Sequence, residues 1–204
     1  MDRLDMVWTF MVTGGPVMVP LVAVSIWMWH LIVVKALWIF RVHRSPFKIS
    51  QALQCLDKAV SDALPMGSPR ARALVYFMQR RHFDPESDRI MWKVAVKREI
   101  FPLKRHMTTL TILAVVAPLL GLLGTVTGMV DTFRAIGIQG TGNPQAMASG
   151  IKEALITTQT GLMIAIPGLL ASQSLRRRIR DLHGDLMIFY RSVDQWLERR
   201  AAHV

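Results

Sequence analysis

The chain has 204 residues, of which 51% are hydrophobic, and a formal net charge of +11 at pH 7. Its single cysteine, Cys55, excludes an internal disulfide framework and a cysteine-rich zinc site. The positive charge does not indicate nucleic-acid binding, because the Lys and Arg residues flank long apolar runs. In that position they contact lipid headgroups and set membrane topology. The composition therefore predicts an integral membrane protein.

Three apolar runs are long enough to cross a bilayer as helices, since a hydrocarbon core of about 30 Å needs about 20 residues. These predicted transmembrane helices are residues 17–40, 107–132 and 149–175. The first run is expected to be retained rather than cleaved, because the region before it is acidic and no small-residue cleavage site follows it. Lys35 lies near its inner end, where the ammonium group can extend to the membrane surface.

The distribution of charge predicts the topology. Residues 41–106 carry 14 Lys and Arg against 6 Asp and Glu, and the tail 176–204 is also basic. By the positive-inside rule both segments are cytoplasmic. Residues 1–16 and the connection 133–148 then lie on the outer side, and three spans satisfy this alternation.

The cytoplasmic segment is predicted to be helical. Ser50 is expected to cap a helix over residues 51–60, which Pro65 and Pro69 end. A second helix is predicted over residues 70–81. A third begins at Asp84, with a proline in its first turn, and is expected to extend the second span into the cytoplasm. No strand signature of useful length is present, so the predicted fold class is all-α.

The tail shows apolar residues at helical spacing, namely Leu182, Leu186, Phe189, Val193 and Leu197. This pattern predicts an amphipathic helix that continues the third span into the cytoplasm. We expect its apolar face to pack on the protein's own cytoplasmic helices, with contact to a partner as the alternative.

The second span carries a stripe of small and hydroxyl residues: Gly121, Gly124, Thr125, Gly128 and Thr132. Spacings of three and four place them on one face of a helix. The glycines are predicted to allow close helix packing, because lipid provides no hydrophobic drive for association. The threonine hydroxyls can both donate and accept hydrogen bonds, so they can also line a hydrated pore.

The third span contains Glu153, a carboxylate that directly precedes the uncharged residues 154–174. Such a group is costly in lipid and normally faces a protein interior or a water-filled path, which indicates ion or proton movement. Thr157 and Thr160 share its helix face, whereas Thr158 is rotated by about 140° from it. Pro167 is predicted to kink the helix and to shape helix packing together with the glycines.

Two stretches carry a family resemblance. Leu119-Leu-Gly-Leu-Leu-Gly-Thr-Val-Thr-Gly-Met-Val-Asp-Thr-Phe133 resembles the second-span signature of the ExbB/TolQ/MotA proton-channel family. Gly150-Ile-Lys-Glu-Ala-Leu-Ile-Thr-Thr-Gln-Thr-Gly-Leu-Met-Ile-Ala-Ile-Pro-Gly168 resembles its third-span signature. The first stretch is closer to ExbB than to TolQ. Thr127 stands where Trp is frequent. Lys152 stands where a small residue is usual, and it either pairs with Glu153 or faces the outer interface.

The resemblance implies a bacterial inner-membrane protein with a periplasmic N-terminus and a cytoplasmic C-terminus. It also implies a ring-forming homo-oligomer, a pentamer around a dimer of the single-span protein ExbD, whose aspartate carries the proton. Proton flow would energise a TonB-like protein and thereby transport across the outer membrane. A TolQ-like subunit of the Tol-Pal system and a non-conducting membrane scaffold are the alternatives.

The resemblance also implies roles for residues. It places Thr125, Glu153 and Thr158 in the proton pathway. On this basis we treat Thr132, Thr157 and Thr160 as secondary pore candidates. No Ser/His pair, His-Glu-x-x-His motif or Asp pair across the spans is present, so the sequence predicts neither an enzyme nor a bound cofactor or metal.

Overall fold

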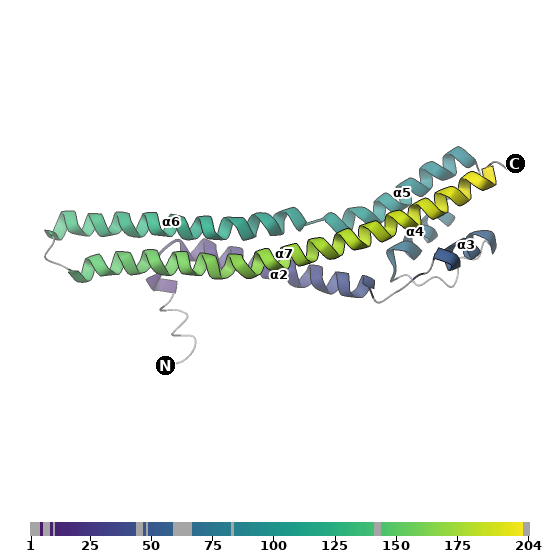
Figure 1. The fold of residues 1–204 in the computed structure, drawn as a ribbon. Helices are drawn as coiled ribbons and strands as arrows, with labels where there is room; N and C mark the ends of the chain where they lie inside the picture. Colours follow the sequence, from purple (N-terminus) through teal and green to yellow (C-terminus); the bar gives the residue numbers. More distant parts are fainter. Residues whose placement is uncertain are drawn as a thin grey trace. The chain divides into compact units, whose positions relative to one another are not determined.

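A computed structural model describes Asp5, Thr9 and residues 11–43, 47, 49–58, 67–82, 84–140 and 144–201. In these residues all regular secondary structure is helical, as Figure 1 shows. The helices are α2 (Met18–His43), α3 (Ile49–Lys58), α4 (Pro69–Met78), α5 (Pro85–Lys104), α6 (Met107–Gln139) and α7 (Pro144–Ala201). The predicted all-α fold is confirmed.

Three helical stretches are long and apolar enough to cross a membrane, which confirms the predicted number of spans. They are Met18–Val42, Pro85–Ile138 and Met147–Ala201. The helices extend beyond the predicted spans, so the connection 133–148 includes the end of α6 and the start of α7. Helix α7 continues without a break from the third span into the tail, as the periodicity predicts, and Pro167 lies inside it.

The chain divides into two compact units, and α2 and α7 contribute to both. Unit 1 comprises Met1–Val33 and His106–Gln173. Unit 2 comprises Val34–Arg105 and Ser174–Val204. Each unit is therefore described separately below.

Unit 2 is built around large aromatic side chains. The rings of Phe77, Trp92 and Phe189 are fully buried, and Trp92 meets each of the other two edge-on at a centroid distance of 5.6 Å. Leu186 and Val193 of α7 belong to the same core. This confirms that the tail helix packs on the chain's own helices α3, α4 and α5.

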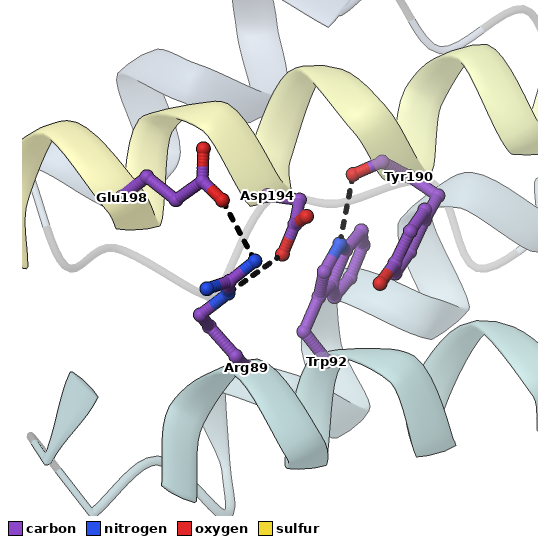
Figure 2. A network of polar contacts seen from close by, with 5 residues as sticks. All are labelled: Arg89, Trp92, Tyr190, Asp194 and Glu198. Carbon is purple, nitrogen blue, oxygen red and sulfur yellow. Dashed lines mark hydrogen bonds and ion pairs between the residues drawn. The ribbon is translucent and has the colours of Figure 1, made fainter. Parts of the chain in front are cut away.

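Polar contacts surround this aromatic core. Figure 2 shows the Arg89 guanidinium of α5 between two carboxylates of α7, at 3.4 Å from Asp194 and 2.7 Å from Glu198. Beside it, the Trp92 indole N–H donates to the Tyr190 carbonyl at 3.0 Å. The hydrogen bond from Arg89 to Asp194 and the two negative charges raise the pKa of Arg89, which stays protonated.

The junction between α5 and α6 differs from the prediction of one continuous helix. Helix α5 ends at Lys104, and His106 adopts a left-handed conformation with φ of 65° before α6 begins. The Lys35 ammonium donates to the carbonyls of Pro102 and Arg105, at 2.8 and 3.1 Å. Lys35 therefore stabilises the C-terminal carbonyls of α5, rather than only extending to the membrane surface.

The short helices differ from prediction at their ends. Helix α3 begins at Ile49, which packs against the aromatic core, so Ser50 lies inside the helix and is not its N-cap. Ala59 and Val60, predicted as its last residues, lie outside the described part of the chain. Helix α4 ends at Met78, three residues before the predicted end. The predicted start of α5 is confirmed, because the Asp84 carboxylate caps it by accepting from the Ser87 N–H at 2.9 Å.

Candidate functional site

In unit 1, α6 and α7 lie side by side and meet through residues that have little or no side chain (Figure 1). A Cβ atom built on Gly121 would lie 3.1 Å from the Thr157 carbonyl oxygen, and one on Gly128 would lie 2.7 Å from the Gly150 carbonyl oxygen. One on Gly124 would overlap the Thr157 side chain. The structure thus places all three predicted packing glycines where the two helices come closest.

The matching stripe on α7 is a feature that the sequence analysis did not single out. Gly150 lies against Gly128 and Thr132, and Gly161 lies against the Ala117 carbonyl and Gly121. The signal was available in the sequence. Small residues recur along α7 at spacings of three and four, at Gly150, Ala154, Thr157, Gly161, Ala165 and Gly168.

Two neighbouring threonines of α7 have different surroundings. The Thr157 side chain is fully buried against Gly124, and its hydroxyl bonds to the carbonyls of Glu153 and Ala154 at 3.1 and 3.0 Å. The Thr158 side chain is half-buried, and its hydroxyl reaches the Gly121 carbonyl of α6 at 3.1 Å. Within this single chain, Thr157 is enclosed by protein, whereas Thr158 bridges the two helices from a partly open position.

The other predicted threonines bond to their own helices. Thr125 donates to the Leu122 carbonyl at 2.7 Å and Thr160 to the Ile156 carbonyl at 2.7 Å, and both side chains are half-buried. Thr132 is buried and also donates to its own helix. Backbone bonding of this kind satisfies the hydroxyl proton and leaves lone pairs on the oxygen that can accept from water or a partner.

Glu153 is half-buried and lies against Gly15, which precedes α2. Lys152 is exposed, and within the described residues no ion pair joins it to Glu153. The first alternative for Lys152, pairing with Glu153, is therefore not seen in these residues, and the second, a position facing the outer interface, stays a prediction. The structure brings Glu153 and Thr157 together through the backbone, and Thr158 near Gly121. In the described part of the chain, the Thr125 hydroxyl bonds to Leu122 of its own helix and not to Glu153 or Thr158.

A second polar pair lies further along the same two helices. The hydroxyls of Thr111 and Ser172 are 3.1 Å apart, and Ser172 is buried. Between Thr160 and Ser172, α7 carries no hydroxyl or charged side chain, a gap of about 18 Å at 1.5 Å per residue. Helix α6 likewise has none between Thr111 and Thr125. The hydroxyls of α6 and α7 therefore do not form a continuous relay along these two helices.

One ionisable side chain inside the predicted first span was not singled out from the sequence. His30 lies in the interior of α2 and is exposed on the single chain. A counting of Lys, Arg, Asp and Glu overlooks it because histidine is neutral by that convention. Among the described residues, no group of three or more His, Cys, Asp or Glu side chains is placed to hold a metal ion.

Comparison with known proteins identifies the family. The MotA/TolQ/ExbB proton channel family matches residues 65–187 of the chain, which include both small-residue stripes and the predicted pore residues. The chain belongs to this family.

Individual family members are similar over most of the chain. A putative biopolymer transport protein, ExbB-like 1, of Synechocystis sp. is 32% identical, over 91% of this chain and 78% of its own length. The biopolymer transport protein exbB1 of Vibrio cholerae is 25% identical, over 86% of both chains. The Tol-Pal system protein TolQ of Haemophilus influenzae is 36% identical over 53% of this chain and 47% of its own length.

Membership of the MotA/TolQ/ExbB family, together with three apolar helices, makes this chain a multi-pass inner-membrane protein of a transport and channel family. The predicted family is confirmed, and relatives named ExbB match 86 to 91% of the chain. The roles of the individual site residues are taken up below as proposals.

Proposed function

We propose that the chain is a proton-channel subunit that works with an ExbD-like single-span partner to energise a TonB-like protein and thereby transport across the outer membrane. Thr125, Glu153 and Thr158 line the path, with Thr132, Thr157 and Thr160 as secondary candidates. Glu153 shapes the electric field of the path, and an aspartate of the partner carries the proton.

The observation that carries this proposal is the position of the carboxylates. The spans contain only Asp131 and Glu153, both near one end, and no carboxylate in residues 17–43, 107–130 or 154–180. Together with the gap in the hydroxyls of α7, this leaves most of the membrane thickness without a carboxylate from this chain. A second component that supplies a carboxylate fits this arrangement.

The topology and assembly form part of the same proposal. The basic segments 41–106 and 176–204 are cytoplasmic, and residues 1–16 and 133–148 are periplasmic. Apolar side chains remain exposed on the membrane faces of α6 and α7, including Leu122 and Met163. These faces contact lipid and neighbouring copies in a homo-oligomeric ring, which we propose to be a pentamer.

The similarity to TolQ of Haemophilus influenzae supports one alternative, a subunit that energises the Tol-Pal envelope system. The two functions are separated by deleting the gene and measuring two properties of the cells. Loss of ferric-siderophore uptake with an intact envelope supports the TonB-linked function. Leakage of periplasmic proteins with normal uptake supports the Tol-Pal function.

The pore assignment is tested with isosteric substitutions in cells that depend on this chain. We expect Glu153→Gln and Thr158→Val each to abolish ferric-siderophore uptake while the protein still accumulates in the membrane and assembles. Thr158→Ser is the matched control, because it retains the hydroxyl that bonds to Gly121. Wild-type uptake by Glu153→Gln would instead favour a non-conducting scaffold.

The different surroundings of Thr157 and Thr158 give a second comparison. Thr157→Val removes a hydroxyl enclosed between the helices, so we expect a smaller loss of uptake than with Thr158→Val. Equal losses would mean that the enclosed hydroxyl matters as much as the partly open one, which contradicts the placing of Thr157 among the secondary candidates.

A further inference from the structure

The turn that precedes α2 covers the Glu153 carboxylate. It contains Gly14, Gly15 and Pro16, and it is closed by hydrogen bonds from the Gly15 N–H to the Val12 carbonyl at 3.3 Å and from the Met18 N–H to the Gly15 carbonyl at 3.1 Å. Gly15 adopts a φ of +67°, a left-handed conformation that side chains rarely adopt.

Both glycines of this turn lie on the same helical turn of α7. A Cβ atom built on Gly15 would overlap Oε1 of Glu153 and lie 3.3 Å from its Cγ. A Cβ built on Gly14 would lie 3.4 Å from Cγ2 of Ile156. The carboxylate therefore rests directly on the backbone of Gly15.

The turn is anchored by the residues that follow it. Val17, Met18 and Leu21 are buried in one cluster with Ala117 of α6 and Ala165 of α7. This packing fixes the start of α2 against the two helices that carry the candidate pore residues. The position of Gly15 against Glu153 is thus set by buried apolar contacts and does not depend on the turn alone.

We propose that Gly15 is a positioning residue for Glu153, and that the turn forms a backbone wall which holds the carboxylate in the orientation the ion path requires. The inference rests on the proposed function, because it assigns Gly15 a role at the same site. A side chain at residue 15 would meet the flexible end of Glu153, so the carboxylate would rotate away while the helices remain packed.

The chain offers a matched control for the strain of a positive φ. Gly140 has a φ of +68°, and a Cβ built there would meet nothing within 4 Å. Gly15→Ala and Gly140→Ala therefore both place an alanine at a positive φ, and only Gly15→Ala displaces Glu153.

The test measures initial rates of ferric-siderophore uptake in cells that carry each variant at matched membrane levels. We expect Gly15→Ala to lower the rate about tenfold through the displaced carboxylate. Gly140→Ala should stay within about twofold of the wild type. Equal rates for Gly15→Ala and Gly140→Ala overturn the proposal.

A second comparison separates positioning from a general structural effect. In a Glu153→Asp background the side chain is one carbon shorter, so its carboxylate is drawn back from Gly15. Adding Gly15→Ala should then change the uptake rate less than about twofold. An equal fold loss in both backgrounds overturns the positioning role.

Failure of the inference and failure of the proposed function give different results. If Glu153→Gln abolishes uptake but Gly15→Ala does not, only the inference fails. If Glu153→Gln transports at the wild-type rate, the proposed function fails and takes the inference with it.

Discussion

Each of the two units of the molecule is stabilised by a different kind of internal contact. In unit 1, α6 and α7 meet through Gly121, Gly124 and Gly128 on one helix and equally small residues on the other. In unit 2, the core consists of large rings around Trp92, and ion pairs such as that of Arg89 surround it. The same helix, α7, contributes to both.

The difference follows from the solvent of each unit. In water, burying a large aromatic side chain gains hydrophobic free energy, so unit 2 is stabilised by ring area. In lipid that gain is absent, and helices associate through close backbone packing and hydrogen bonds to carbonyls. Along α7 the buried residues are therefore small as far as Ser172 and large and apolar from Leu175 onward. Four predictions test this comparison.

The largest effect is expected in unit 2. Trp92→Ala removes a fully buried ring and its hydrogen bond to the Tyr190 carbonyl, and should lower the free energy of unfolding by about 3 to 5 kcal/mol. Phe101→Ala on the same helix is the control, because Phe101 is 72% exposed and should change stability by less than about 0.5 kcal/mol. Thermal unfolding in detergent, followed by circular dichroism, measures both. Similar losses would contradict the assignment of the core.

A smaller effect, of opposite sign at two glycines, is expected in unit 1. Gly124→Ala forces a methyl group into Thr157 and should destabilise the protein by about 1 to 3 kcal/mol. Gly137→Ala, on the same helix but with open space around it, should stabilise by up to about 1 kcal/mol. The same unfolding measurement compares them. Destabilisation by Gly137→Ala would show that the gain expected from helix propensity is wrong at this position.

The ion pairs of unit 2 should contribute less than its rings. The Arg89 side chain is 47% exposed, so Arg89→Ala should lower stability by much less than Trp92→Ala. High salt should reduce this difference by screening the charges. Arg191→Ala, an exposed arginine of α7, is the control. A loss that is unaffected by salt would indicate that the Arg89 stem acts through packing.

The smallest effect is a pH dependence at the start of α5. Hydrogen bonds from Ser87 lower the pKa of Asp84 below its usual range. The cap therefore contributes stability above the unfolded pKa of about 3.9, and this contribution is lost as the pH falls through the lower folded value. Asp84→Asn can still cap the helix but cannot titrate. Unfolding of unit 2 between neutral and acidic pH should thus depend less on pH in this variant than in the wild type.

Much of the helical arrangement could be predicted from the sequence because it is periodic. Spacings of three and four placed the glycines of α6 on one face, and the apolar spacing from Leu182 to Leu197 predicted a tail helix that packs on its own chain. The signatures around Thr125 and Glu153 indicated the family. The pore roles of these residues remain predictions, because the structure of one chain contains no partner.

What could not be predicted depends on contacts between distant parts of the chain. Neither glycine nor an adjacent proline marks the break at His106, and the carbonyls freed there are bound by Lys35 of another helix. Gly15 and Glu153 are separated by most of the sequence, and no periodicity links them. The start of α3 at Ile49 likewise follows from packing against a core whose members lie far along the chain.

The Lys35 contact also constrains how the protein is made. Its first acceptor, the Pro102 carbonyl, lies 67 residues further along the chain. At about 5 to 20 residues per second, synthesis of that segment takes roughly 3 to 13 s. During this interval the ammonium group lacks both of its carbonyl acceptors. Final seating of the C-terminal part of α2 therefore waits on translation, and it is a late step in the biogenesis of the protein.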